Sequence, residues 1–163
     1  MAEETFKYTS TDVALLMMSR AAKNKIVMNY TKVQKFLFIL YTLYLTSQGQ
    51  RLTDEGPRAW PFGPVFPTVK RRLEKWKVNI ESFKIEDYED KLSDKDVIKD
   101  KTLNEMCDAI FTSGFGKMTA NQLVAWTHTP GAPWDLTTKK SGFKWNDPIA
   151  DDLIERYYGK PKA

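Results

Sequence analysis

The sequence predicts a mainly α-helical fold: a single compact domain over residues 1–163, with about six helices around a central apolar helix at about 30–48. Three observations lead to this prediction. Apolar residues recur at helical spacing in several stretches, N-cap residues stand in front of these stretches, and the length suits one sizeable core. The rest of the chain leaves room for a small β-hairpin. Residues 1–9 and 159–163 are expected to be short flexible ends.

The first two helices are predicted from their caps. Ser10 or Thr11 is a suitable N-cap for a helix that ends near Lys23. Asn29 and Gly49 are the expected ends of the second helix, because asparagine caps helix N-termini and glycine terminates helices. In the second half of this helix, apolar side chains cover most of the circumference, which is typical of a helix packed on several sides. Its helically spaced apolar positions are Val33, Phe36, Leu37, Leu40, Leu43 and Tyr44.

Glycines and prolines between residues 50 and 64 exclude a helix there and set the start of the third helix. Trp60 is expected to be extended, because a residue before proline is pushed out of the helical region. The third helix begins between Pro64 and Pro67, since proline is tolerated only in the first helical turn. Its apolar stripe consists of Phe66, Val69, Leu73 and Trp76.

The second half of the chain carries weaker signals. Phe83 and Ile85 alternate with polar residues, which predicts a short edge strand inside a charged, solvated stretch. A fourth helix fits residues 103–111. Thr119 and Gln122 have the spacing of a capping box that opens a fifth helix. The last helix is expected to have Asp147 as N-cap and Pro148 as its first residue.

The formal net charge of +4 is too small to indicate a nucleic-acid partner, but the charges are unevenly distributed. Five cations and one carboxylate lie in 70–77, and eight carboxylates and four lysines lie in 81–100. The basic stretch can therefore be neutralised within its own chain. Its cations could contact phosphates, yet no helix-turn-helix, zinc-finger or RNA-binding signature accompanies them. A solvated face or an acidic protein partner is favoured over nucleic acid.

A cytoplasmic location is expected. The single cysteine, Cys107, fits a reducing compartment, and the N-terminal residues lack the pattern of a secretory signal. The longest apolar run, FLFILYTLYL at 36–45, has ten residues and is too short to cross a membrane. No membrane partner is therefore expected.

The sequence yields no convincing catalytic or metal site. GFGKMT at 114–119 fails as a phosphate-binding loop, because Phe111 stands where the first glycine is required and Met118 follows the lysine. One histidine and one cysteine cannot build a conventional zinc site. The carboxylates of Asp94, Asp96 and Asp100 are better explained by a solvated acidic loop than by magnesium.

His128 and Cys107 could form a base and nucleophile only if the fold brings them together, and Cys107 lies on an apolar helical stripe. His128 stands near the end of the fifth helix, where an imidazole can bind free carbonyl groups or stabilise the helix end. We therefore expect no catalytic residue, no metal and no cofactor, and a binding protein rather than an enzyme.

Three blocks in order resemble the Panacea antitoxin domain, the family of SocA-like and GepA-like proteins. They are YTKVQKFLF at 30–38, AWPFGPV at 59–65, and LVAWTH at 123–128 followed by Pro133-Trp134. The resemblance covers about residues 12–158, without a counterpart for the insert at 81–102. Val33 and Phe36 replace more usual leucines, which are conservative apolar changes. The hallmark residues are Trp60, Gly63, Pro64, Val65, Thr127, His128 and Trp134.

The resemblance implies an antitoxin that silences a cognate protein toxin by direct contact. One branch of the family instead delivers its toxin to a protease as an adaptor, and a nucleic-acid-binding regulator is a further alternative. The short ends argue against neutralisation by a long disordered arm, so a folded surface is expected to bind the toxin. We interpret the hallmark residues as scaffold, since turn and core roles explain their types. The candidate toxin-facing residues are Arg71, Arg72, Lys75, Glu86 and Asp87.

Overall fold

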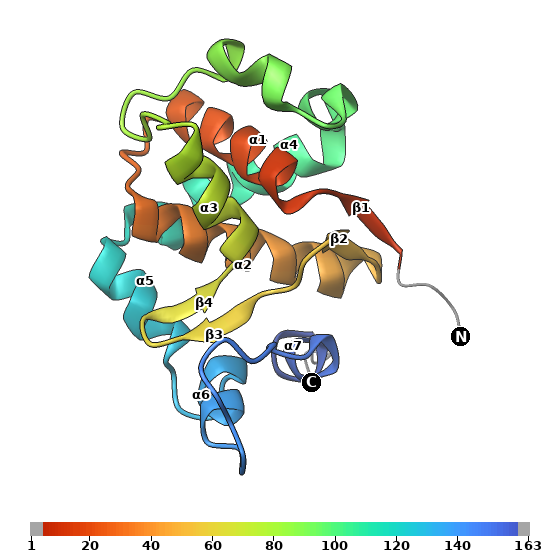
Figure 1. The fold of residues 1–163 in the computed structure, drawn as a ribbon, viewed down its shortest axis with the longest axis vertical. Coiled ribbons are helices and arrows are strands. Elements are labelled where there is room, and N and C mark those ends of the chain that lie inside the picture. The colour runs from red at the N-terminus through yellow and green to blue at the C-terminus, as the bar shows by residue number, and fades with distance from the viewer. Residues whose placement is uncertain (1–4, 160–163) are drawn as a thin grey trace.

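The computed structural model describes residues 5–159, and its architecture confirms a mainly α-helical single domain with small β elements (Figure 1). None of the helices in these residues combines the length and hydropathy that a membrane-spanning helix needs. The α-helices are α1 (Ser10–Lys23), α2 (Tyr30–Gln48), α3 (Pro67–Lys75), α4 (Lys101–Thr112), α5 (Ala120–Thr127), α6 (Pro133–Thr138) and α7 (Asp151–Tyr158). The 3₁₀-helices are η1 (Ile85–Lys91), η2 (Lys95–Lys99) and η3 (Gly114–Lys117). The strands are β1 (Phe6–Tyr8), β2 (Arg51–Thr53), β3 (Arg58–Trp60) and β4 (Gly63–Val65).

Helix α2 is the centre of the fold, as the sequence predicts. It crosses the middle of the molecule, with α1, α3 and α4 on one side and β3, β4, α6 and α7 on the other (Figure 1). Both predicted ends are correct. The Asn29 side chain accepts a hydrogen bond from the Lys32 N–H at 2.9 Å, and Gly49 ends the helix with φ 67°. Because α2 contacts neighbours all around, its buried face includes the polar residues Gln34 and Lys35.

The N-terminal region differs from the prediction. Helix α1 has Thr9 as its N-cap, because Thr9 Oγ1 accepts the Asp12 N–H at 3.2 Å. The two residues predicted as caps have tertiary roles instead: Ser10 Oγ donates to Glu55 at 2.6 Å, and Thr11 Oγ1 accepts from Arg72 at 3.3 Å. Residues 6–8 form β1, which pairs in parallel with β2, so the expectation of a flexible end is wrong there. The predicted flexible ends at 1–4 and 160–163 lie outside the described residues.

Strands β3 and β4 form a small antiparallel hairpin in which Trp60 pairs with Gly63. The other edge of β3 is occupied by residues 146–149: the Ala59 N–H donates to Asp147 O at 2.9 Å, and Arg58 bridges to Pro148. This extended contact explains why the predicted start of the last helix is wrong. Pro148 is held beside the hairpin, and α7 begins at Asp151.

The insert after α3 packs on α1 rather than forming an edge strand. The predicted strand at Phe83 and Ile85 is wrong, because Ile85 opens the 3₁₀-helix η1. The apolar side chains of Phe83, Leu92 and Val97 are buried and join the main core. A solvated loop is therefore too simple a description, since three buried side chains fasten this charged stretch to the domain.

Candidate functional site

The three hallmark blocks converge on one internal region, which we call the junction: residues 30–35 of α2, the hairpin 58–66, and residues 127–134. Its first connection is the buried amide of Gln34. The Gln34 Oε1 accepts the Phe66 N–H at 2.7 Å, and its Nε2 donates to the Phe66 carbonyl at 3.3 Å and to Tyr30 at 2.8 Å. Phe66 is the N-cap of α3. One side chain of α2 therefore fixes the position at which α3 starts.

Lys35 makes the second connection. Its side chain is only 2% exposed, and its Nζ donates to the Pro64 carbonyl at 2.9 Å. Burial lowers the pKa of Lys35 to about 8, because the charged amine loses hydration. Among residues 5–159, no carboxylate forms an ion pair with this amine. A buried amine with one carbonyl partner thus holds the hairpin against α2.

Gly63 allows the closest approach in the junction. Its φ is +111°, a region that favours glycine. A Cβ atom at this position would also lie 2.7 Å from Thr127 Oγ1 and 3.0 Å from Lys35 Cε. Both the backbone conformation and the available space therefore require glycine, and the first two blocks meet the third here.

Two tryptophans and His128 complete the junction. The rings of His128 and Trp134 stack at 3.6 Å and 5°, and Trp134 Nε1 donates to the Trp60 carbonyl at 2.9 Å. Trp60 Nε1 in turn donates to Asn146 Oδ1 at 2.9 Å. Burial, with a smaller contribution from the Lys35 charge, lowers the pKa of His128. The lowered pKa favours the neutral imidazole, and the described residues offer no hydrogen-bond partner to its buried Nε2.

A groove of about 270 Å³ lies at the junction, between the start of α2 and the hairpin tip. Phe62 lies at that tip and is 74% exposed, which is unusual for a large apolar side chain. The Lys70 ammonium lies 5.6 Å from the centre of the Tyr30 ring at the edge of the groove. This region, which we call the hairpin groove, joins exposed aromatic surface to the cations of α3.

The predicted toxin-facing cations are exposed on α3. Arg71 donates to Thr68 Oγ1 at 3.1 Å, and Arg72 donates to Thr11 Oγ1 at 3.3 Å. Lys75 is also exposed. Among residues 5–159, no ion pair joins the cations of 70–77 to the carboxylates of 81–100, and Lys70 pairs with Glu74 on its own helix. The neutralisation expected within the chain is therefore not made by direct ion pairs.

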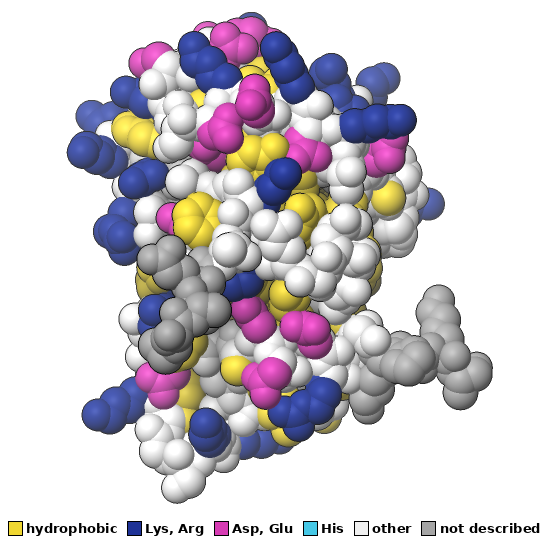
Figure 2. All heavy atoms as spheres, turned by 90° about the vertical axis from the view of Figure 1, so that its right-hand side faces the viewer, with side chains coloured by type: hydrophobic (Ala, Val, Ile, Leu, Met, Phe, Trp, Pro, Cys, Tyr) yellow, Lys and Arg dark blue, Asp and Glu magenta, His cyan; other side chains and the backbone are white. Residues whose placement is uncertain are grey.

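The predicted acidic candidates, Glu86 and Asp87, are exposed in the first turn of η1. Figure 1 places η1 at the end of the molecule remote from the hairpin. Its last residue, Lys91, has its Nζ 5.7 Å from the ring centre of Trp76, the C-cap of α3, so η1 adjoins the C-terminal end of that helix. On the face shown in Figure 2, Lys and Arg side chains are interspersed with Asp and Glu. Charge of both signs is thus spread over that face, without the continuous basic surface that a nucleic-acid backbone requires.

The remaining chemical candidates have structural roles. Cys107 is buried on α4, and burial raises its pKa to about 12, so the thiol stays protonated. Asp94 accepts the N–H of Asp96, and Asp100 caps α4 and accepts from Tyr8. Within the described part of the chain, no three His, Cys, Asp or Glu side chains converge as a metal ion would need.

Sequence reasoning missed two junction residues, Gln34 and Lys35, although both lie in the first hallmark block. The available signal was a polar pair inside an otherwise apolar helical face. It also missed Asp12 on α1. This side chain is 1% exposed and accepts the N–H groups of Ser93 and Asp94, both at 2.9 Å. A buried carboxylate at the start of a helix is easily mistaken for a capping residue.

Comparisons with known proteins identify a family whose model spans most of the junction. The family model "Antitoxin SocA-like, Panacea domain" matches residues 33–135, a range that includes Lys35, Gly63, His128 and Trp134. The curated protein "Antitoxin SocA" of Caulobacter vibrioides (strain NA1000 / CB15N) is 31% identical over 138 residues, which are 80% of this chain and 70% of that protein. No solved structure matches the chain. The chain belongs to the SocA-like Panacea domain family of antitoxins, as its three sequence blocks predict.

Proposed function

We propose that this protein is an antitoxin that neutralises a protein toxin by direct contact with its folded surface. The observation that carries the proposal is the 31% identity to an antitoxin over 80% of the chain. The junction supports it indirectly. Its side chains are engaged with one another, so the scaffold is fixed while the exposed residues around it are free to suit one particular toxin.

The toxin-contacting surface that we propose is the hairpin groove together with the exposed cations Arg71, Arg72 and Lys75. Aromatic and arginine side chains contribute much of the binding energy in protein interfaces, and both types lie here beside a fixed scaffold. The cations also favour a toxin with an acidic contact surface. The second candidate surface is the acidic one around Glu86 and Asp87.

Co-expression tests the function. The neighbouring gene is expressed alone and together with this protein, and growth is measured. Arrested growth that this protein restores supports the proposal, and the tagged pair is then purified as a complex. Unchanged growth on expression of the neighbouring gene, together with no complex in a pull-down, contradicts the pairing with that neighbour.

Toxin abundance distinguishes direct inhibition from adaptor activity. Direct binding predicts a stable complex and an unchanged toxin level after rescue. An adaptor predicts that the toxin disappears and that rescue is lost when the protease is removed. Salt-sensitive binding to a DNA duplex, with no effect on growth, would instead favour a nucleic-acid-binding regulator.

A further inference from the structure

The walls of the hairpin groove are held in place by hydrogen bonds to other parts of the fold. The Tyr30 hydroxyl accepts from Gln34 Nε2 at 2.8 Å, and Gln34 is fastened to the start of α3 through both backbone groups of Phe66. On the hairpin side, the Trp60 indole donates to Asn146 at 2.9 Å. Figure 1 shows the hairpin tip on the side of the molecule where α2 begins. A partner that enters this groove meets aromatic walls that are already ordered, which lowers the entropic cost of binding.

The lining of the groove is apolar and cationic. It consists of three aromatic residues, a proline, a valine, two uncharged polar residues and the lysines Lys35 and Lys70, with no carboxylate from residues 5–159. The nearby carboxylate of Glu55 is already engaged, because it accepts from Ser10 Oγ at 2.6 Å and from the Thr68 N–H at 3.1 Å. Since Lys35 is buried, Lys70 is the lysine of the lining that is open to direct contact. A guest that is apolar and carries a negative charge is therefore complementary to this groove.

The size of the groove favours a side chain of a protein over a free small molecule. Its volume of about 270 Å³ lies below the range of about 300–1,000 Å³ that small-molecule sites usually have. Its aromatic lining is accessible, since Phe62 is 74% exposed and Tyr30 and Trp60 are half-buried. Aromatic side chains of this kind are typical anchors of protein interfaces. The groove thus suits one apolar side chain of a protein partner.

Lys70 provides the accessible positive charge at the edge of the groove. Its ammonium lies 5.6 Å from the centre of the Tyr30 ring and forms an ion pair with Glu74, one turn further along α3. The Glu74 side chain is 62% exposed, so this pair is solvated and contributes little to stability. A partner's carboxylate, brought to the groove by an apolar neighbour and shielded from water there, can therefore take the place of Glu74 beside Lys70.

We propose that the toxin fills the hairpin groove with an apolar side chain that lies next to an aspartate or glutamate. The apolar side chain packs among Tyr30, Trp60 and Phe62, and the carboxylate replaces Glu74 as the partner of Lys70. The groove belongs to the surface proposed above, so this assignment rests on the proposed function and adds the chemistry of the toxin segment. It also gives Glu74 a role, as a carboxylate of the antitoxin that competes with the toxin for Lys70.

The test of the apolar contact uses the purified toxin that co-expression identifies, and surface plasmon resonance measures its dissociation constant. Phe62→Ala removes one aromatic side chain of the groove and should weaken binding by about tenfold. The matched control is Phe6→Ala, because Phe6 is also an exposed phenylalanine, at 47%, and lies on β1 outside the groove. The control should bind the toxin as the wild type does. Equal midpoints of thermal unfolding show that both variants are folded.

Two changes on α3 test the carboxylate. Lys70→Gln should weaken binding by about fivefold, because it removes the counter-charge of the toxin's carboxylate. Glu74→Gln should instead strengthen binding by about twofold, since the competing carboxylate of the antitoxin is gone. A contact that serves stability alone would not give this gain. In the double variant the gain should disappear.

The inference is overturned if Phe62→Ala and Phe6→Ala bind the toxin equally well, or if Glu74→Gln fails to strengthen binding. A wild-type protein that binds no toxin contradicts the proposed function itself, and the inference falls with it. Binding of a single-stranded oligothymidylate that Phe62→Ala abolishes, and that added salt weakens steeply, would make nucleic acid the occupant of the groove and overturn the assignment to a toxin segment.

Discussion

The junction and the acidic segment at 81–100 are attached to the domain in opposite ways. The junction joins three distant parts of the chain through buried side chains, with hydrogen bonds from Gln34, Lys35 and Trp134 to backbone carbonyls of other elements. The acidic segment has short 3₁₀-helices with mostly local bonds, and it is fastened by three apolar side chains and the carboxylate of Asp12.

This difference bears on how each candidate surface can bind a toxin. Residues of α3 start from a helix cap that Gln34 holds in place, so the cations beside the hairpin are pre-organised. Glu86 and Asp87 lie on a short 3₁₀-helix, whose hydrogen-bond geometry is poorer than that of an α-helix, so ordering them on binding costs more free energy. The comparison favours the hairpin and α3 as the contact surface, and four experiments test it.

The largest effect is expected at Gly63. Gly63→Ala places a Cβ against Thr127 and Lys35 in an unfavourable backbone conformation, and we expect it to lower the free energy of unfolding by about 3–4 kcal/mol. Gly131→Ala is the matched control, because Gly131 also has a positive φ of +84° but no atom within 4 Å of the new Cβ. Its loss should be about 1 kcal/mol. Equal losses in urea unfolding would contradict the close packing of the junction.

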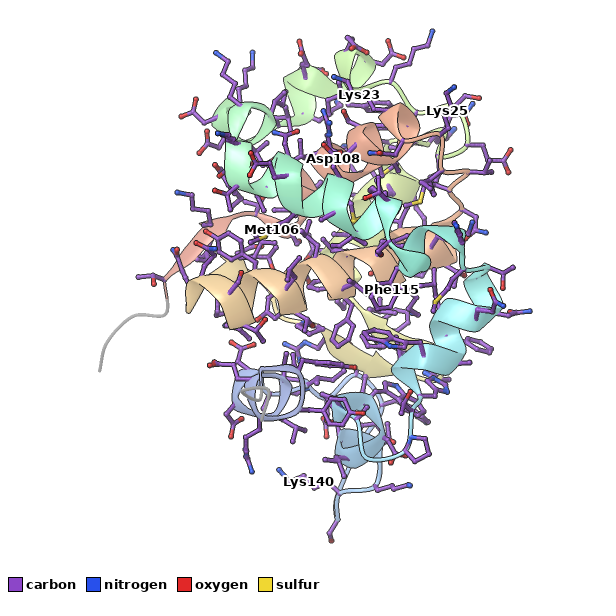
Figure 3. The ribbon with its side chains drawn as sticks, turned by 180° about the vertical axis from the view of Figure 1, so that it is seen from behind. Lys23, Lys25, Met106, Asp108, Phe115 and Lys140 are labelled. Carbon is purple, nitrogen blue, oxygen red and sulfur yellow. The ribbon has the colours of Figure 1, made fainter. Side chains whose placement is uncertain are left out.

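The second effect is expected at the anchor of the acidic segment. Asp12→Ala removes a buried acceptor of two backbone N–H groups, and we expect a loss of about 2–3 kcal/mol. Hydrogen exchange should become faster mainly at 81–100. The control is Asp108→Ala, which breaks the Arg20–Asp108 ion pair between α1 and α4. Asp108 is labelled in Figure 3. Unchanged exchange at 81–100 in Asp12→Ala would show that the apolar side chains suffice as anchors.

The third effect is a pH dependence set by Lys35. Its pKa is about 8 in the folded protein and 10.5 without burial, so the unfolded chain binds more protons between these values. Lys35 should therefore contribute a rise of about 2 kcal/mol to the free energy of unfolding between pH 8 and pH 10. Cys107 and the buried tyrosines act in the opposite direction in the same window, because burial raises the pKa of Cys107 and of Tyr30 to about 12. The Lys35 contribution is therefore measured as the difference between the wild type and Lys35→Met, which should grow by about 2 kcal/mol over this window, and a constant difference would exclude Lys35 as the cause.

The smallest effect on stability is expected on α3. Arg71→Glu with Arg72→Glu changes exposed side chains and should alter the free energy of unfolding by less than about 0.5 kcal/mol. Association with the toxin should nevertheless slow by about tenfold at low salt, because the steering charge is reversed. Glu86→Lys with Asp87→Lys is the matched control on the other surface. Unchanged association in the arginine variant, measured by surface plasmon resonance, would exclude the α3 surface.

The sequence predicted those parts of the fold that depend on neighbouring residues. Asn29, Gly49 and the pair Thr119–Gln122 act within one helical turn, and each has its predicted role. The errors arose where a backbone segment pairs with a distant part of the chain instead of forming the local structure that its residues favour. Pro148 has the right type for a helix start, but its backbone lies along β3 instead. Local sequence patterns cannot reveal such a distant pairing partner.

The candidate site was also predictable in its local features and not in its distant contacts. The hallmark blocks could be identified from residue types and their spacing, whereas their connections could not. A lysine is rarely buried without a carboxylate, so the polar pair in the apolar face of α2 did not identify Lys35 as the link to the hairpin. Asp12 was hidden for a related reason, because its partners are backbone N–H groups 81 and 82 residues away.

The central test is a hydrogen-exchange comparison of this protein alone and in complex with the toxin that co-expression identifies. Binding through the hairpin groove and α3 predicts slower exchange at residues 58–75 and at the start of α2, with 81–100 unchanged. Protection confined to 81–100 would contradict this assignment and make the acidic segment the toxin-binding surface.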